Sequence, residues 1–184
     1  MTDTTPAKVA FLLKRGVEQP ELTEPWAAVR DAGFTPVLVS EEPGTITALI
    51  GDWDRGDDFP VDVTLDQADP EDYIALVLPG GTLNADKLRT NPRAIAFTQA
   101  FAAAGKTIAA ICHGPWLLIE AGIVPGRTLT STRRIATDLT NAGARWVDQE
   151  VVVDGSLITS RSPRDLPAFD SALVHALAGA VTAG

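Results

Sequence analysis

The chain has 184 residues, of which 45% are hydrophobic and 21% charged, as in one globular domain of ordinary size and unlike a disordered chain. The net charge of −9 repels polyphosphates and argues against nucleic acids and anionic membranes as partners. One cysteine and two histidines exclude an internal disulfide framework and argue against a metal site, and we expect no cofactor.

The N-terminal eight residues are polar and contain no apolar signal core. No apolar run approaches the ~18 residues that a membrane span needs. A single unpaired thiol fits a reducing compartment. We therefore expect a cytoplasmic protein.

Apolar runs alternate along the chain with segments of helical periodicity. The first part predicts a strand at 9–13, a helix at 20–32, a strand at 35–39, a hairpin whose strands 45–49 and 61–65 flank the polar stretch 51–58, and a strand at 74–78. The second part predicts a helix at 92–104, a strand at 107–111, a helix at 116–121, a short strand near 129, a helix at 135–142, a hairpin at 150–160 and a closing helix at 163–180. This alternation predicts one α/β domain over residues 1–184, with a mostly parallel sheet and helices on both faces.

An acidic run lies in the predicted hairpin, at Asp52, Asp54, Asp57 and Asp58. A calcium loop that started at Asp52 would need glycine at its sixth position and glutamate at its twelfth. The chain has Asp57 and Val63 there, so we expect a solvated hairpin tip.

The lone cysteine, Cys112, directly follows the predicted strand 107–111, and Pro115 begins the next helix. A buried strand that turns sharply into a helix forms a nucleophile elbow, which lifts its side chain out of the sheet. At a helix N-terminus, unpaired N–H groups favour a thiolate. The alternative is a buried cysteine that only fills space. Its place at a strand end, before a helix-initiating proline, favours the nucleophile.

Ligands of open α/β sheets bind beyond the carboxyl ends of the strands. The turn 79–81 ends the neighbouring predicted strand, so the backbone N–H groups of Gly81 and His113 are candidates for an oxyanion hole. Glu18 follows the first strand and belongs to the same rim, where a carboxylate would tune the thiol.

Only His113 and His175 are available as an imidazole base. His113 is adjacent to Cys112, and neighbouring side chains on a helix do not face each other, so the pair needs the sharp elbow to meet. His175 lies among Leu173 and Leu177 in the closing helix, where we expect a surface or partly buried residue without a catalytic role.

Several segments together resemble the PfpI family of intracellular cysteine proteases, within the class I glutamine amidotransferase-like superfamily. They are 16–18 with 21–22, 75–81, 110–115, 141–144 and 148–155 leading to 159–161. The resemblance covers nearly the whole chain. It implies a flavodoxin-like three-layer sandwich and a homodimer or a larger homo-oligomer.

The resemblance also implies a set of site residues. Cys112 is the nucleophile, His113 flanks it, and Glu18 hydrogen-bonds to the thiol. An acid after the Gly-Gly turn, usually Glu in the family, completes the site across a subunit interface, and the matching position here is Asp86, one methylene shorter.

Three positions separate this chain from related proteins. Trp116 stands where many PfpI relatives have Gln, and Thr132 where some have Tyr. Glutamine amidotransferases of the superfamily need a distant His-x-Glu pair, whereas His175 is followed by Ala176-Leu177. That activity is therefore not expected.

The resemblance leaves three functions open. The first is cysteine chemistry on reactive carbonyls, as a deglycase or glyoxalase-like hydrolase in stress protection, and we favour it because addition to a small carbonyl needs no long groove. The second is an intracellular peptidase acting on peptide substrates through a Cys-His-acid triad. The third is a non-catalytic redox sensor or chaperone in which Cys112 is oxidised.

Overall fold

The computed structural model describes residues 5–182, and its centre is a seven-stranded sheet. The strand order is β10-β11-β7-β6-β1-β2-β5, and every neighbouring pair is parallel except β10 with β11. The bounds are β1 Lys8–Leu12, β2 Thr35–Ser40, β5 Val63–Thr64, β6 Tyr73–Leu78, β7 Thr107–Ile111, β10 Val151–Asp154 and β11 Leu157–Ser160. The predicted mostly parallel sheet is thus confirmed.

Two small sheets, six α-helices and three short 3-10 helices complete the described chain, and the 3-10 helices are Pro70–Asp72, Arg133–Ile135 and Pro163–Asp165. The small sheets pair β3 Thr45–Ile50 with β4 Asp54–Pro60, and β8 Thr128–Leu129 with β9 Arg145–Trp146. The helices are α1 Gln19–Asp31, α2 Thr82–Arg89, α3 Pro92–Ala103, α4 Pro115–Glu120, α5 Ala136–Asn141 and α6 Leu166–Thr182.

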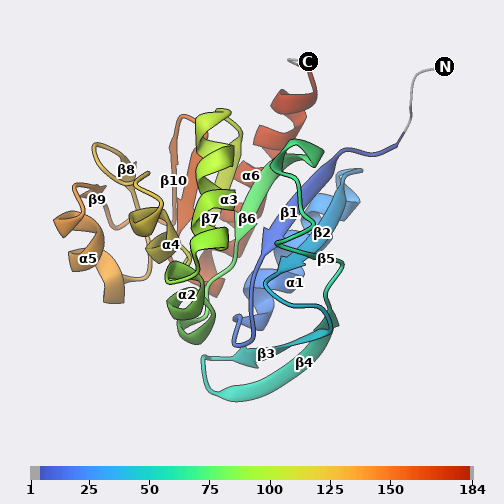
Figure 1. Cartoon of the computed structure of the whole chain (residues 1–184). Coiled ribbons are helices and arrows are strands. Elements are labelled where there is room, and N and C mark those ends of the chain that lie inside the picture. Colours follow the sequence, from blue (N-terminus) through green and yellow to red (C-terminus); the bar gives the residue numbers. More distant parts are fainter. Residues whose placement is uncertain (1–4, 183–184) are drawn as a thin grey trace.

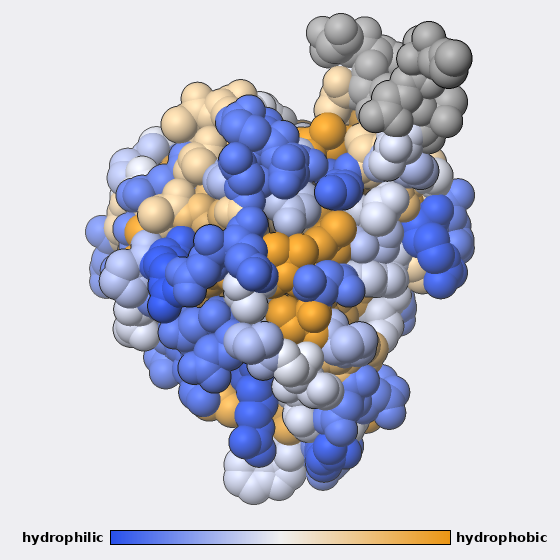
Figure 2. Space-filling model, turned by 45° about the vertical axis from the view of Figure 1, so that its right-hand side comes forward, coloured by the Kyte–Doolittle hydropathy of each residue, from blue (hydrophilic) through white to orange (hydrophobic). Residues whose placement is uncertain are grey.

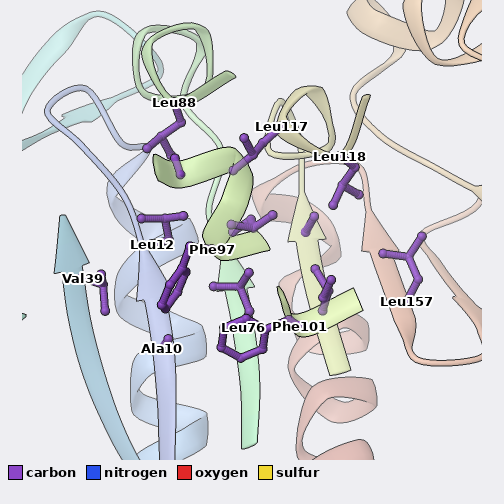
Figure 3. Close-up of a cluster of buried hydrophobic side chains, with 14 of the residues drawn as sticks. Ala10, Leu12, Val39, Leu76, Leu88, Phe97, Phe101, Leu117, Leu118 and Leu157 are labelled. Carbon is purple, nitrogen blue, oxygen red and sulfur yellow. The ribbon is translucent and has the colours of Figure 1, made fainter. Parts of the chain in front are cut away.

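Helices cover both faces of the sheet, as the alternating pattern predicts (Figure 1). Side chains of β1 alternate between the faces because the strand period is two residues. Ala10 and Leu12 belong to the core under α2, α3 and α4, which Figure 3 shows, whereas Val9 and Phe11 belong to the core under α1 and α6. The result is the three-layer, flavodoxin-like arrangement.

The hairpin prediction was right in kind and wrong in its second strand. β3 pairs with β4, which lies in the polar stretch, whereas Val63–Thr64 joins the main sheet beside β2. β4 has few apolar residues and is largely exposed, so an apolar pattern does not reveal it. Helix α2 was not predicted, because only Asn84, Ala85 and Leu88 of its eight residues are buried.

No helix in residues 5–182 has the length and apolar character needed to cross a bilayer. Most of the surface shown in Figure 2 is hydrophilic, and its largest apolar area lies near the middle of the view.

Candidate active site

The loops after β1, β6 and β7 meet at the carboxyl edge of the sheet, because these strands are parallel neighbours. The Glu18 N–H donates to Gly80 O at 3.3 Å. Gly81 has φ +90°, and a Cβ there would lie 2.3 Å from Gly16 O. Glycine is therefore required at 81 for the two loops to approach this closely.

Cys112 stands in a sharply turned backbone between β7 and α4. Its φ is 62°, a left-handed conformation that non-glycine residues rarely adopt and that is frequent at functional sites. Its N–H donates to Ser160 O at 3.0 Å, and its carbonyl accepts from the Thr132 N–H at 3.0 Å. These bonds hold the elbow that the strand-to-helix sequence predicts.

The carboxyl group that contacts the Cys112 thiol belongs to Glu21. Glu21 is fully buried in the first turn of α1, and its Oε2 accepts from the Gly80 N–H at 2.8 Å. Its Oε1 meets no conventional hydrogen-bond partner, and Glu21 and Cys112 interact through their side chains. A Cβ on Gly80 would lie 2.3 Å from Glu21 Oε2 and 2.7 Å from Cys112 Cβ, so the three residues form one tight cluster.

Glu18 was predicted to hydrogen-bond to the thiol, and that prediction was wrong. Glu18 precedes α1 with extended backbone, and its carboxylate accepts from the N–H groups of Gly51 and Asp52, at 2.8 and 2.9 Å. It thus binds the turn of the β3–β4 hairpin. Glu21 lies on the buried face of α1 with Pro25 and Val29, at a spacing of four residues. An acid on the apolar stripe of an amphipathic helix is the sequence signal that identifies it.

Burial raises the pKa of Glu21 to about 8, so its carboxyl is protonated at neutral pH and can donate a hydrogen bond. Burial also raises the pKa of the Cys112 thiol, and Glu21 raises it further when it is ionised, whereas the His113 backbone N–H lowers it. The thiolate that a helix N-terminus would favour is therefore not the resting form. The thiol needs a base to remove its proton.

His113 lies where such a base would stand. Its side chain is buried, and its Nδ1 lies 3.3 Å from Cys112 Sγ, so the elbow does bring the adjacent pair together. Burial lowers the pKa of His113, which leaves the imidazole neutral and able to accept a proton. The ring packs against Trp116, with centroids 5.3 Å apart, and the indole N–H of Trp116 donates to Asp138 at 2.8 Å. Trp116 thus packs along one side of the His113 ring.

Two residues of the cluster had no predicted role in it. Thr82, at the start of α2, has its Oγ1 3.3 Å from Nε2 and 3.5 Å from Nδ1 of His113. Asp52 accepts from both the N–H and the Oγ1 of Thr82, at 2.6 and 2.8 Å. Asp52 is half-buried, so its carboxylate is not part of a merely solvated tip, unlike the exposed Asp54.

The other predicted residues lie as follows. Asp86 is exposed on α2, one helical turn after Thr82, and its contact with a neighbouring subunit stays a prediction. The Gly81 N–H likewise stays a prediction for the oxyanion hole. His175 is exposed on α6, as expected. Within residues 5–182, no group of three or more His, Cys, Asp and Glu side chains is arranged to hold a metal ion.

The chain is similar to several known proteins. The sequence profile of the DJ-1/PfpI family matches residues 7–176. A protein of Pyrococcus horikoshii named as a deglycase is 42% identical over 162 residues, which cover 88% of this chain and 94% of that one. Protein/nucleic acid deglycase 2 of Escherichia coli is 41% identical over 165 residues, covering 89% and 93%. The crystal structure of Drosophila melanogaster DJ-1beta superposes with a TM-score of 0.85 at 28% identity, covering 95% and 92%.

Proposed function

The chain belongs to the DJ-1/PfpI family, and on that premise we propose that it is a cysteine-dependent deglycase that hydrolyses glyoxal or methylglyoxal adducts of amines and thiols. One observation carries the proposal: the Cys112 thiol has a neutral imidazole at 3.3 Å as a base and a protonated carboxyl, that of Glu21, as an acid. Addition to a carbonyl group needs these two proton transfers.

The addition step uses each of these groups once. His113 Nδ1 takes the proton from Sγ as the sulfur attacks the carbonyl carbon. The π electrons of the C=O bond move to the oxygen, which takes the proton of Glu21. One S–C bond and one O–H bond have then formed, Glu21 is a carboxylate and His113 an imidazolium. The N–H groups of Gly81 and His113 would stabilise the developing oxyanion.

The test is turnover of a defined adduct. Purified protein is mixed with the methylglyoxal adducts of N-acetylcysteine and of N-acetyl-lysine, and the release of free thiol and free amine is followed. We expect turnover by the wild type and by His175→Gln, which alters only an exposed histidine. We expect none with Cys112→Ser. Equal rates for Cys112→Ser and the wild type would refute the proposal.

The same Cys112–His113 contact favours a peptidase as the second candidate. A peptidase would cleave fluorogenic peptides and need an acid behind its histidine, for which the prediction names Asp86 from a neighbouring subunit. Peptide cleavage that depends on Cys112, with no turnover of the adducts, would replace the first proposal by this one. A redox sensor would instead gain two oxygen atoms at Cys112 after mild peroxide treatment and turn over neither substrate.

We also propose that the protein assembles as a homodimer or a larger homo-oligomer. Ile50, Trp53 and Leu83 are exposed apolar residues on the elements that carry Asp52 and Thr82, and Trp53 is 88% exposed. A second copy covering them would remove apolar surface from water. Light scattering during size exclusion tests this, because a monomer at all concentrations would contradict it.

A further inference from the structure

The residues behind His113 form a continuous hydrogen-bonded chain that starts at Glu18. Glu18 is 7% exposed, and its two carboxylate oxygens each accept one backbone N–H, from Gly51 and Asp52. A parallel bridge between Glu18 and Leu49 adds a second tie between the start of α1 and the hairpin. Asp52 itself has φ 64°, a strained conformation that these contacts hold in place.

The carboxylate of Asp52 points at the start of α2. Oδ1 accepts the Thr82 N–H at 2.6 Å, and Oδ2 accepts the Thr82 hydroxyl at 2.8 Å. The hydroxyl has a single proton and gives it to Asp52, so its oxygen can only accept from His113. The hydroxyl oxygen lies 3.3 Å from Nε2 and 3.5 Å from Nδ1 of His113. Because Nδ1 also faces the Cys112 thiol, we assign the ring proton to Nε2.

This assignment leaves the lone pair of Nδ1 free on the side of the thiol, at 3.3 Å from Sγ. When His113 takes the thiol proton, the positive charge on the ring lies one hydroxyl away from the Asp52 carboxylate. Of the charged groups that act on His113, Asp52 raises its pKa and Arg134 lowers it, while burial lowers it most. Asp52 is thus the charge that favours the imidazolium.

We propose that Asp52 and Thr82 position His113 from within the same subunit, fixing its Nε2–H tautomer, and that Glu18 holds Asp52 in place. The catalytic meaning of this inference rests on the proposed deglycase function. Asp52 and Thr82 are positioning residues, since they act through His113. Asp52 supplies a carboxylate behind the histidine without a neighbouring subunit, which is the role that the family resemblance implies for Asp86.

Asp52→Asn is the sharpest test, because asparagine tolerates a left-handed backbone and keeps the acceptor for the Thr82 N–H. Its amide would donate to the Thr82 oxygen, so the hydroxyl proton would turn toward His113. We expect the tautomer to change from Nε2–H to Nδ1–H, which nitrogen-15 NMR resolves. The chain has only two histidines, and His175→Gln removes the other signal.

In the same variant we expect kcat to fall about tenfold to a hundredfold, as for loss of general-base efficiency. The acid limb of the pH–rate profile should move to lower pH, because Asp52 raises the pKa of His113. Thr82→Val should reproduce the loss, and Thr82→Ser should restore activity because it keeps the hydroxyl. Asp54→Asn is the matched control: it removes one charge from the same hairpin at an exposed position and should change nothing.

Asp52→Asn with wild-type kcat, pH profile and tautomer would overturn the inference. So would a kcat loss that appears in Asp86→Asn and not in Asp52→Asn. The NMR measurement needs no substrate. If the wild type turns over no adduct while the tautomer changes as expected, the positioning chain stands and the proposed function fails.

Discussion

The change Glu21→Gln should make the protein more stable at neutral pH, although Glu21 is buried and hydrogen-bonded. Glutamine keeps an oxygen that can accept the Gly80 N–H, which Glu21 Oε2 now accepts at 2.8 Å. It cannot ionise. Burial opposes the charged form of Glu21, so folding at neutral pH requires the carboxyl to take up a proton, which costs free energy. Glutamine needs no proton and retains the contact with Gly80.

The size and sign of this penalty follow from linkage. The pKa of Glu21 is about 8 in the folded protein against an ordinary 4.5, so the folded state binds the proton more tightly than the unfolded chain does. The contribution of Glu21 to folding stability is therefore most favourable below pH 4.5 and declines as the pH rises toward 8. Between the ordinary pKa of 4.5 and pH 7 there are about 2.5 pH units. At about 1.36 kcal/mol per unit, Glu21 therefore lowers the free energy of unfolding by about 3 kcal/mol at pH 7.

Urea unfolding followed by tryptophan fluorescence at pH 5, 7 and 8 measures the effect. Glu21→Gln should exceed the wild type by about 3 kcal/mol at pH 7 and by under about 1 kcal/mol at pH 5. The control Asp86→Asn removes an exposed carboxyl and should stay within about 0.5 kcal/mol of the wild type throughout. A Glu21→Gln protein that is less stable than the wild type by the same amount at pH 5 and pH 7 would refute the reasoning.

Three further predictions concern the same cluster and one half-buried acid, Asp170. Because the Glu21 carboxylate raises the pKa of the Cys112 thiol, Glu21→Gln should speed the alkylation of Cys112 by iodoacetamide above about pH 8, where Glu21 of the wild type is ionised; equal rates there would mean that the two side chains do not interact. Gly80→Ala would place a Cβ 2.3 Å from Glu21 Oε2 and 2.7 Å from Cys112 Cβ. It should lower the free energy of unfolding in urea by about 1–3 kcal/mol and remove most of the activity. An active and stable variant would contradict that packing. Burial and the nearby Glu24 raise the pKa of Asp170 to about 7, so Asp170→Asn should stabilise the protein more at pH 8 than at pH 5. The gain should be smaller than that of Glu21→Gln because Asp170 is only half-buried. Equal effects at both pH values would count against this prediction.

The sequence was sufficient for the elements whose burial produces a clear period. The apolar runs of β1, β6 and β7 are buried on both faces, so each predicts a strand within one residue of its observed ends. The same reasoning misses β4 and α2, where few side chains are buried. Secondary structure that tertiary contacts stabilise leaves little pattern in its own segment.

The site shows the same division at the level of single residues. Cys112 and His113 could be predicted because their chemistry is adjacent to a strand end, which is a local feature. The choice between Glu18 and Glu21 could not be made from their place on the rim, because both follow β1. It depends on which side chain the first turn of α1 directs inward, and that direction follows from the buried stripe that contains Leu22, Pro25 and Val29.

The cost of Glu21 is itself an argument for function. The cost of about 3 kcal/mol at pH 7 is a large fraction of the free energy of unfolding of native proteins, which is roughly 5–15 kcal/mol. Glutamine would fill the same space and keep the Gly80 contact without that cost. What glutamine cannot do is release a proton to a substrate oxygen and take it back. A destabilising acid beside a strained cysteine is what the proposed addition step, which takes the proton of Glu21, leads us to expect.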